Sequence, residues 1–493
     1  MSFLSGLYRT PLALLTDLYE LTMAYGYWKE GLRDTEATFH LFFRRNPFQG
    51  GFTIACGLAQ VVEYLEGLRF LPEDLAYLAS IPGADGRPLF SAEFLRDLGR
   101  LEFACDVDAV PEGTVVFPQE PLIRVQGPIF QAQILETALL NLINFQTLIA
   151  TKAARVCLAA AGEPVLEFGL RRAQGIDGGI SAARAAFVGG CAATSNVLAG
   201  RLFGIPVRGT HAHSWVMCFD SEQEAFDAWV DAMPNNAVFL VDTYDSLDGV
   251  RHAVEAGRRL KARGQELLGI RLDSGDLAYL SIEARRILDE GGFPEAEIFA
   301  SNDLDEHIIT SLKLQGAQIF VWGVGTKLVT AYDEPALGGV YKLAAVRKPA
   351  SEWSQKIKLS EQSIKISTPG VQQVRRYSSA TECLADAIFD VHLGIRDHPT
   401  LIDAMDITRR KRIAEDLAHE DLLLPIFRRG RRVYEVPPIA AAQERTRAQL
   451  ARFHSGIKRF VFPHQYPVGL EERLFDLKTR LVLAAREGIG QEH

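Results

Sequence analysis

The sequence predicts an α/β protein whose middle part is a series of parallel strands joined by helices. Between residues 164 and 326, six short apolar runs each end in a polar cluster and lead into a segment with apolar residues at helical spacing. Strand, polar tip and helix recur about every 20 to 40 residues, which is typical of parallel strands with crossover helices. The pattern therefore predicts either a (β/α) barrel or an open doubly wound sheet.

The polar tips of these strands are the first candidates for a functional site. The six runs are Pro164–Leu170, Ile205–Gly209, Ala237–Val241, Leu267–Leu272, Glu297–Ala300 and Ala317–Trp322. In a barrel, the carboxyl ends of the strands converge on one mouth, where polar residues are usually functional. Turns are polar for structural reasons too, but they seldom need His, Arg, Asp and paired Gly directly after a buried strand. We therefore interpret the tips as an active-site mouth.

The two ends of the chain are expected to build a second, flanking domain. The predicted divisions are an N-terminal α+β segment over 1–125, the barrel with the active site over 126–345, and a C-terminal segment over 346–493 that completes the flanking α+β domain. The first segment is expected to begin with a helix capped by Thr16 and to contain a strand at Ala37–Phe43. The last is expected to contain an extended run at Val433–Tyr434 and a final helix near Leu470–Arg486.

Composition excludes several classes of protein. With 493 residues, 47% of them hydrophobic, the chain can bury a large core. The net charge of -9 argues against a bulk nucleic-acid partner. No stretch approaches the roughly 20 uninterrupted apolar residues of a membrane helix, and the N-terminus lacks a signal-peptide pattern. The six cysteines lack CxxC spacing, which predicts reduced thiols and a cytoplasmic protein. The basic clusters Arg409–Arg412 and Arg428–Arg432 are interpreted as solvated surface.

His211 and His213 follow the second run and invite a metal interpretation. An HxH pair at a strand end begins the ligand set of metal-dependent barrel hydrolases, but such a site needs further ligands from later strand ends. The other histidines lie in helical segments or in the flanks. We therefore favour a nucleophilic or acid–base histidine beside a phosphate site, with the metal site as the alternative.

Two further segments suggest a phosphorylated sugar as ligand. Arg271–Asp276 places two carboxylates, a cation and a hydroxyl around a glycine turn, which suits a ribose with a magnesium-bound diphosphate. Asp273 or Ser274 could instead cap the following helix, and both roles can hold together. Gly323–Thr326, followed by Lys327, is typical of a cradle in which backbone amides and a hydroxyl bind a phosphate.

An aromatic residue and two arginines end the first run. Arginine binds carboxylates or phosphates in bidentate fashion, so Phe168 with Arg171–Arg172 suggests a flat heterocycle that carries an acid group. The alternative is that Phe168 belongs to the core and that one arginine pairs with a neighbouring carboxylate.

Several motifs together resemble those of the nicotinate phosphoribosyltransferase family. In chain order they are Thr16–Met23, Glu167–Gly175, Ala212–Ser214, Asp242–Asp245, Arg271–Asp276 and Gly323–Thr326. The resemblance covers about residues 10 to 380 and implies an irregular parallel (β/α) barrel of the type II phosphoribosyltransferase kind, with a flanking α+β domain. It implies that nicotinate and 5-phosphoribosyl 1-diphosphate give nicotinate mononucleotide and diphosphate in the salvage route of NAD biosynthesis, coupled to ATP hydrolysis through a phosphohistidine.

The resemblance also implies the roles of individual residues. The catalytic set is His213 (the phosphohistidine), Arg171 and Asp273. The nicotinate contacts are Tyr19, Phe168, Thr210, Ser214 and Arg271. The 5-phosphoribosyl 1-diphosphate contacts are Asp242, Ser274, Gly275, Asp276, Asn302, Gly323, Gly325 and Thr326. Mg²⁺ is expected through the substrate diphosphate, ATP as co-substrate, and a homodimer with shared sites, because Tyr19 would reach the ring from the neighbouring subunit.

The chain departs from the family pattern at three places. His211 stands where the family more often has Met or Leu, so its role is open. Cys191–Ala193 stands where a related enzyme that uses nicotinamide has an Asp, which favours the acid substrate. Pro369–Gln372 lacks one expected cation. The alternatives are a nicotinamide or quinolinate phosphoribosyltransferase, a metal-dependent barrel hydrolase, and a catalytically silent scaffold.

Overall fold

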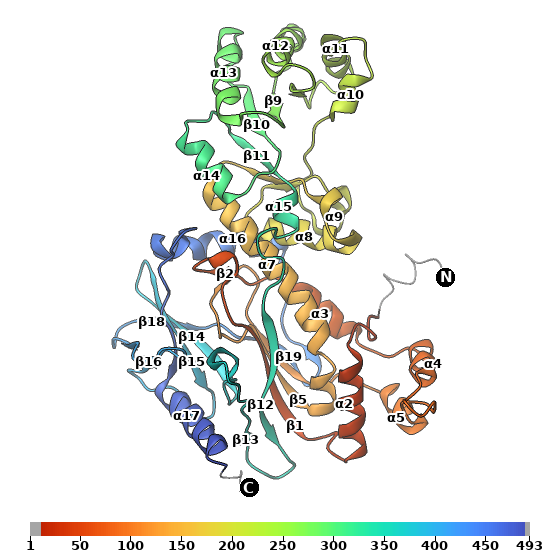
Figure 1. Cartoon of the computed structure of the whole chain (residues 1–493), viewed down its shortest axis with the longest axis vertical. Coiled ribbons are helices and arrows are strands. Elements are labelled where there is room, and N and C mark those ends of the chain that lie inside the picture. The colour runs from red at the N-terminus through yellow and green to blue at the C-terminus, as the bar shows by residue number, and fades with distance from the viewer. Residues whose placement is uncertain (1–10, 489–493) are drawn as a thin grey trace. The chain divides into compact units, whose positions relative to one another are not determined.

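The computed structural model describes residues 11–488 and divides the chain into two compact units (Figure 1). One unit contains the chain up to Thr147 and again from Ala336, and the other is Leu148–Pro335. The boundaries predicted after residues 125 and 345 lie elsewhere, since 126–147 and 336–345 fall in the first unit. The last of these segments belongs to a strand that pairs with an N-terminal strand, a partnership that no local pattern reveals.

The first unit contains a seven-stranded antiparallel sheet with the order β13-β12-β1-β5-β3-β19-β20. Strand β1 (Glu36–Phe43) confirms the strand predicted at Ala37–Phe43, and seven of its eight residues are buried. It lies inside the sheet because it pairs with β12 on one side and with β5 on the other, and its buried residues include the polar Thr38 and His40. The other strands are β3 (Asp106–Ala109), β5 (Ile123–Pro128), β12 (Gly339–Arg347), β13 (Ser354–Gln355), β19 (Leu424–Arg428) and β20 (Arg431–Arg432).

A second sheet of the first unit is mixed and has six strands in the order β17-β16-β21-β15-β14-β18. They are β14 (Gln372–Ser378), β15 (Cys383–Asp390), β16 (Thr400–Ile402), β17 (Arg410–Arg412), β18 (Ala418–Asp421) and β21 (Val468–Glu471), and β2 (Thr53–Ile54) pairs separately with β4 (Val115–Val116). The predicted final helix is confirmed as α17 (Glu472–Arg486). Strand β20 ends at Arg432, directly before the extended run predicted at Val433–Tyr434, and the Val433 N–H still donates to the Ile426 carbonyl oxygen on β19 at 2.9 Å.

Helices complete the α+β character of the first unit. The α-helices are α2 (Leu18–Lys29), α3 (Leu58–Gly67), α4 (Pro72–Ser80), α5 (Ala92–Leu98), α6 (Ile129–Gln133), α7 (Glu136–Ala160), which continues into the second unit, and α16 (Ile439–Ala451); short 3-10 turns are η1 (Pro47–Gln49), η3 (Ser363–Lys365) and η4 (Ser455–Lys458). The predicted cap is wrong by one residue: Asp17 is the N-cap residue of α2, and Thr16 Oγ1 donates to Glu20 Oε2 at 3.3 Å. No helix within residues 11–488 combines the length and hydropathy needed to cross a membrane.

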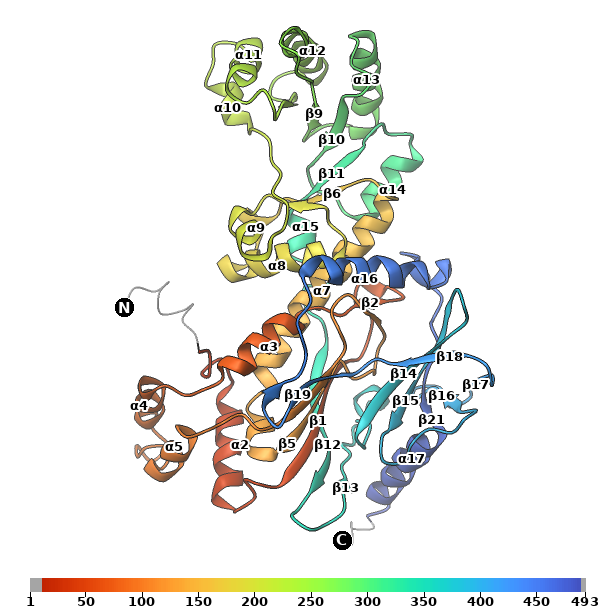
Figure 2. The ribbon, with the colours of Figure 1, turned by 180° about the vertical axis from the view of Figure 1, so that it is seen from behind.

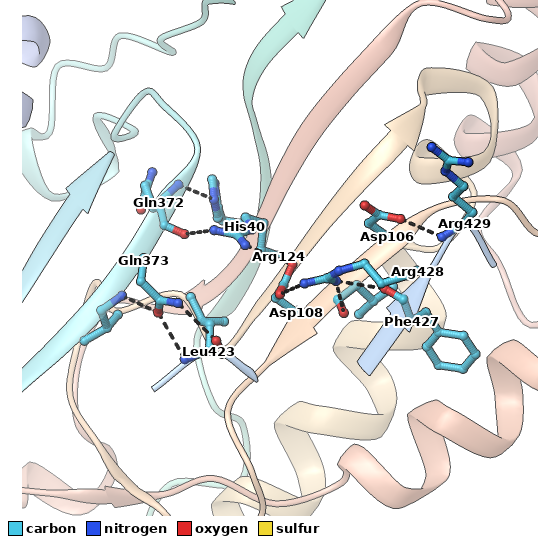
Figure 3. A network of polar contacts seen from close by, with 12 residues as sticks. His40, Asp106, Asp108, Arg124, Gln372, Gln373, Leu423, Phe427, Arg428 and Arg429 are labelled. Atoms are coloured by element: carbon cyan, nitrogen blue, oxygen red, sulfur yellow. Dashed lines mark hydrogen bonds and ion pairs between the residues drawn. The ribbon is translucent and has the colours of Figure 1, made fainter. Parts of the chain in front are cut away.

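A network of polar side chains joins the two sheets of the first unit (Figure 3). Arg124 on β5 pairs with Asp108 at 2.9 Å and donates to the carbonyl oxygen of Gln372 on β14 at 2.8 Å. The backbone N–H of Gln372 donates to His40 Nε2, and burial, with the charge of Arg124, holds the pKa of His40 well below its ordinary value. Arg428 also binds Asp108, at 2.6 Å, so the second basic cluster is not only solvated surface.

The second unit contains a six-stranded parallel sheet, which confirms the α/β class (Figure 2). The strands are β6 (Val165–Glu167), β7 (Ala193–Thr194), β8 (Val238–Leu240), β9 (Gly269–Leu272), β10 (Glu297–Ala300) and β11 (Val321–Val324), in the order β7-β6-β11-β10-β9-β8. Five of the six predicted runs contribute a strand. Ile205–Gly209 contributes only one bridge, from Val207 to Thr194. The sequence missed β7 because two residues are too short to show alternation.

The first strand of this sheet in the chain, β6, pairs with the last, β11. The two edges of the sheet are β8 and, on the other side, β7 with the bridge to Val207. Within the described part of the chain no ladder joins Val207 to β8. Side chains cross this seam instead: the Leu240 N–H donates to His211 Nε2 at 3.3 Å, and Asn236 Nδ2 donates to the carbonyl oxygen of Gly209 at 3.3 Å. A histidine therefore accepts an edge N–H that would otherwise face the seam.

Helices follow the strands of the second unit, and several start at a capping aspartate. They are α8 (Gly175–Gly189), α9 (Val197–Phe203), α10 (His213–Met217), α11 (Glu222–Ala232), α12 (Ser246–Ala262), α13 (Leu277–Glu290), α14 (Glu306–Leu314) and α15 (Thr326–Val329), with the 3-10 turn η2 (Leu170–Arg172) after β6. Asp245, Asp276 and Asp305 accept hydrogen bonds from the first-turn N–H groups of α12, α13 and α14. Part of the polarity of the strand tips is therefore helix capping.

Candidate active site

Carboxylates at the ends of β8 and β9 form the centre of the candidate site. Asp242 Oδ2 accepts hydrogen bonds from the Asp273 N–H at 2.9 Å and from Ser274 Oγ at 2.6 Å. Asp273 Oδ1 in turn accepts one from Ser301 Oγ, at the end of β10. Asp242 Oδ1 is buried and accepts no hydrogen bond from any described residue. Two aspartates are thus held firmly, with one oxygen left over for a ligand.

His213 lies beside this carboxylate pair. It is the first residue of α10, and 41% of its side chain is exposed. Its Nδ1 is 3.1 Å from Thr243 Oγ1, and its Nε2 is 3.8 Å from Asp273 Oδ2. The hydroxyl fixes the ring on one side and the aspartate faces it on the other, so the imidazole is oriented yet accessible to a ligand.

Arg271 lies in a cavity of about 1140 Å³ within the second unit, together with Phe168 and Thr210. Arg271 Nη1 donates to Thr210 Oγ1 at 2.5 Å. Arg271 Nε is buried and makes no hydrogen bond to residues 11–488. Burial lowers the pKa of Arg271, while Asp273 and Asp242 oppose this shift. A guanidinium stays charged in this setting, so the cavity offers a cation to an anionic group and an aromatic ring to a planar one. The Thr210 hydroxyl proton is donated to the His211 carbonyl oxygen at 3.2 Å.

Phe168 serves the core as well as the cavity. Its ring packs against Leu166, Ala193 and Val321 on the neighbouring strands, and it is only partly buried. The two interpretations offered by the sequence therefore hold together for this residue.

The glycine loop after β11 is packed closely against the end of β6. Gly323 lies inside β11 rather than after it, and a Cβ there would be 2.8 Å from the Phe168 ring. A Cβ on Gly325 would be 3.1 Å from the Phe168 carbonyl oxygen. Thr326 begins α15, and Lys327 Nζ donates to Asp305 Oδ2 at 2.6 Å. Small residues are needed here for packing, and the predicted cation of the cradle is already paired.

Other predicted site residues occupy exposed strand tips. Arg171 is exposed on η2, and its charge contributes to lowering the pKa of Arg271. Ser214 is exposed on α10. Gly275 and Asn302 both have positive φ, +80° and +110°, which marks tight turns after β9 and β10. Within residues 11–488, none of these four residues makes a hydrogen bond to Asp242 or Asp273.

Two predicted residues have positions that differ from the rest. Asp276 Oδ1 accepts the Tyr279 N–H at 3.1 Å and caps α13, so the capping alternative applies to this residue rather than to Asp273 or Ser274. Tyr19 belongs to the first unit, on α2, and is exposed. Burial, with the charges of Glu136 and Glu20, raises the pKa of Tyr19.

His211 is a structural residue of the seam. It is buried, and its ring lies 4.9 Å from Trp229 and 6.3 Å from Phe239 between centroids. Burial lowers its pKa to about 4, so the ring is neutral at pH 7. Its Nε2 lone pair already accepts the Leu240 N–H, which counts against a metal-binding HxH pair.

Four polar residues that support the site were given no role in the sequence analysis, although two of them lie within the family motifs. They are Glu167, Thr194, Thr243 and Ser301, of which Glu167 Oε2 accepts from Thr194 Oγ1 at 2.6 Å. Burial raises the pKa of Glu167, although its hydrogen bonds from Thr194 and the Gly169 N–H oppose this. A carboxylate inside the apolar run Pro164–Leu170 was the available signal, because a buried charge needs donors nearby.

The fold and site define a class: an α/β protein whose parallel sheet carries two carboxylates, a histidine and an arginine at or near the carboxyl ends of its strands. Family models for the N-terminal and C-terminal domains of nicotinate phosphoribosyltransferase match residues 14–144 and 372–478. Nicotinate phosphoribosyltransferase of Bacillus subtilis is 42% identical over 490 residues, covering 98% of this chain and 97% of that one. The human enzyme of that name is 34% identical and covers 95% and 96%.

Solved structures agree. The crystal structure of human nicotinic acid phosphoribosyltransferase matches with a TM-score of 0.80 and 32% identity, covering 94% of this chain and 99% of that one. The nicotinate-nucleotide pyrophosphorylase of Pyrococcus furiosus matches with a TM-score of 0.68 at 22% identity, covering 90% and 95%, and shares the fold. The chain belongs to the nicotinate phosphoribosyltransferase family, which confirms the resemblance seen in its motifs.

Proposed function

We propose that this enzyme forms nicotinate mononucleotide and diphosphate from nicotinate and 5-phosphoribosyl 1-diphosphate, in the salvage route of NAD biosynthesis. The observation that carries the choice of substrate is Arg271, whose buried Nε lacks a protein partner in the described chain and which shares a cavity with Thr210 and Phe168. A guanidinium pairs with a carboxylate, and the ring offers a face to a planar heterocycle. Ala192 and Ala193 line the same cavity and offer no carboxylate to an amide. The carboxylates that do line it, Glu266, Glu295 and Glu297, lie before or at the start of β9 and β10, whereas Arg271 lies near the end of β9.

The reaction requires positioning more than proton transfer. The pyridine nitrogen attacks C1 of the ribose, the bond from C1 to the diphosphate oxygen breaks, and diphosphate leaves. The ring nitrogen already has a lone pair, so no general base is needed. Positive charge develops on the sugar, and Asp242 and Asp273 lie where carboxylates can bind ribose hydroxyls and stabilise that charge. Holding both substrates in line lowers the activation barrier by several kcal/mol, on the order of what well-positioned reactants gain.

His213 is the proposed site of ATP-dependent phosphorylation. With Nδ1 donating to Thr243 Oγ1, Nε2 carries the lone pair and attacks the terminal phosphorus of ATP; the bond to the bridging oxygen breaks and ADP leaves. Asp273, 3.8 Å from Nε2, stabilises the positive ring during the transfer. Side-chain exposure of 41% leaves room for the nucleotide.

Mg²⁺ fits this site as a partner of the substrate. No group of three or more His, Cys, Asp or Glu side chains within residues 11–488 could hold a metal on its own. Mg²⁺ is usually bound by one or two carboxylates together with substrate phosphates, and Asp242, with its spare buried oxygen, fits that pattern. When bound, Mg²⁺ neutralises charge on the leaving diphosphate.

Three structural proposals accompany the activity. We infer that the parallel sheet is an irregular (β/α) barrel of the type II phosphoribosyltransferase kind, because its first and last strands pair and one seam remains. A homodimer with shared sites is supported by exposed apolar side chains, among them Leu18 and Tyr19 on α2 and Val197 and Leu202 on α9. A cytoplasmic location is supported by six cysteines without disulfides, although Cys218 is exposed.

A substrate panel tests the proposal. Purified enzyme is given nicotinate, nicotinamide or quinolinate with 5-phosphoribosyl 1-diphosphate, with and without ATP, and the mononucleotide is measured. We expect product from nicotinate, stimulation by ATP, and label from terminally labelled ATP on the wild type but not on His213→Asn. Preference for nicotinamide or quinolinate would overturn the substrate assignment. Unlabelled wild type that still makes product would overturn the coupling alone.

A further inference from the structure

A cluster of buried charges is linked to the Gly323–Thr326 loop through Lys327, and the proposed reaction does not use its residues. Asp305 is buried, and its two carboxylate oxygens have different partners. Oδ1 accepts hydrogen bonds from the N–H groups of His307 and Ile308 and so caps α14. Oδ2 accepts a hydrogen bond from Lys327 Nζ at 2.6 Å. Because α14 follows β10 and α15 follows β11, one aspartate ties together the loops of two neighbouring parallel strands.

Further ion pairs extend the cluster to α7. Lys152 on α7 is fully buried and lies 2.8 Å from Glu306, the first residue of α14, and 2.6 Å from Asp333, which follows α15. Arg155, one turn further along α7, lies 2.7 Å from Glu306. Charges therefore attach the start of α15 to the N-cap residue of α14, and the segment after α15 to α7, which is itself paired with α14.

The pairing leaves Lys327 little freedom to act as a phosphate ligand. Its side chain is 21% exposed and that of Asp305 is 7% exposed. Burial lowers the pKa of Lys327, but the hydrogen bond and charge of Asp305 outweigh it, so the pKa lies above its ordinary value. A buried ion pair that lost one partner would leave the other uncompensated, which opposes its opening.

The glycine loop is fixed on its other side by β6. The Phe168 N–H donates to the Val324 carbonyl oxygen at 2.9 Å, and the Cβ of any larger residue at Gly169 would meet Val329 on α15. Packing on one side and charge on the other thus determine where Gly325 and Thr326 lie.

We infer that Asp305 and Lys327 are positioning residues that hold the Gly323–Thr326 loop in its phosphate-binding geometry, and that Lys327 is not itself a phosphate ligand. The inference rests on the proposed function, since it takes the phosphate groups of 5-phosphoribosyl 1-diphosphate as the ligand of the loop. It revises the cradle predicted from the sequence, in which Lys327 was a cation close to the phosphate.

Asp305→Asn and Lys327→Met separate the two roles. Asparagine still offers an oxygen to the first turn of α14 but loses the charge that holds Lys327. If both residues position the loop, each variant raises the KM for 5-phosphoribosyl 1-diphosphate about tenfold, and the double variant is no worse than either single one. The KM for nicotinate stays within about twofold, and Lys327→Arg recovers most of the loss.

The opposite result would identify Lys327 as a ligand. In that case Asp305→Asn frees the lysine and leaves the KM unchanged or lower, while Lys327→Met alone raises it. Unchanged KM values in both variants also overturn the inference.

Lys313→Met is the matched control, because Lys313 also lies on α14 and pairs with Glu163 at 2.6 Å, away from the loop. It should leave the KM for 5-phosphoribosyl 1-diphosphate unchanged. Circular dichroism melts show whether each variant is folded. Calorimetric titration with inorganic diphosphate measures binding at the loop without turnover. Weaker binding is expected for Asp305→Asn and for Lys327→Met, and unchanged binding refutes the positioning role. A wild type that makes no nicotinate mononucleotide refutes the proposed function, while the titration still decides the role of the pair.

Discussion

Gly169→Ala is the substitution that tests most directly how the end of β6 supports the glycine loop. The glycine has φ −97° and ψ −7°, values open to alanine, so its backbone creates no strain. Space is the constraint. An added Cβ would lie 2.3 and 2.6 Å from the two methyl groups of Val329 and 2.9 Å from the Gly325 carbonyl oxygen. Carbon atoms normally approach to about 3.5–4.0 Å, so α15 must move by about 1 Å.

Overpacking of this kind costs about 1–3 kcal/mol of folding free energy. At about 2–4 °C per kcal/mol, thermal denaturation followed by circular dichroism should show a Tm lower by roughly 2–12 °C. Because the loop itself moves, the kcat/KM for 5-phosphoribosyl 1-diphosphate should fall between about tenfold and a hundredfold.

Gly178→Ala serves as the control for the glycine prediction. Gly178 lies within α8, and nothing is within 4 Å of its added Cβ. Alanine is favoured over glycine inside a helix by up to about 1 kcal/mol, so the Tm should stay level or rise slightly and the kinetics should be unchanged. A Gly169→Ala enzyme with wild-type Tm and wild-type kinetics would refute the close packing described here.

Two further predictions concern stability. The pKa of His211 is about 4 in the folded chain and 6.5 in the unfolded chain, so between these pH values only the unfolded chain is largely protonated at His211. The free energy of unfolding therefore falls as the pH is lowered through that range. His211→Gln keeps an acceptor but cannot titrate, and urea denaturation should show a shallower pH dependence; an unchanged slope contradicts the buried, neutral ring. Arg376, 1% exposed, pairs with the fully buried Asp386, so Arg376→Met should cost about 3–5 kcal/mol. Arg375→Met, which loses the more exposed pair with Asp421, should cost less than about 1 kcal/mol in the same denaturant titration; equal losses would contradict the difference in burial.

The sequence predicted which residues lie at the strand ends better than it predicted their partners. Short apolar runs were enough to identify five of the strands, and the family motifs selected Asp242, Asp273 and His213, which the structure brings together. Residue type and chain order carry that information, because parallel strands place their carboxyl ends at one edge. Local sequence could not assign partners. Lys327 looked like a phosphate ligand, yet it is bound by Asp305.

By itself, the sequence determined the α/β class, the family and the residue types at the strand ends, since these depend on periodicity and on motifs that are local in the chain. Only the tertiary structure decided which side chains meet. His211 closes a seam with Leu240, and β12 returns from residue 339 to pair with β1, so that the unit boundaries fall at Thr147 and Ala336. The physical reason is that hydrogen-bond partners and burial are set by contacts between residues far apart in the chain, and a local pattern does not record them.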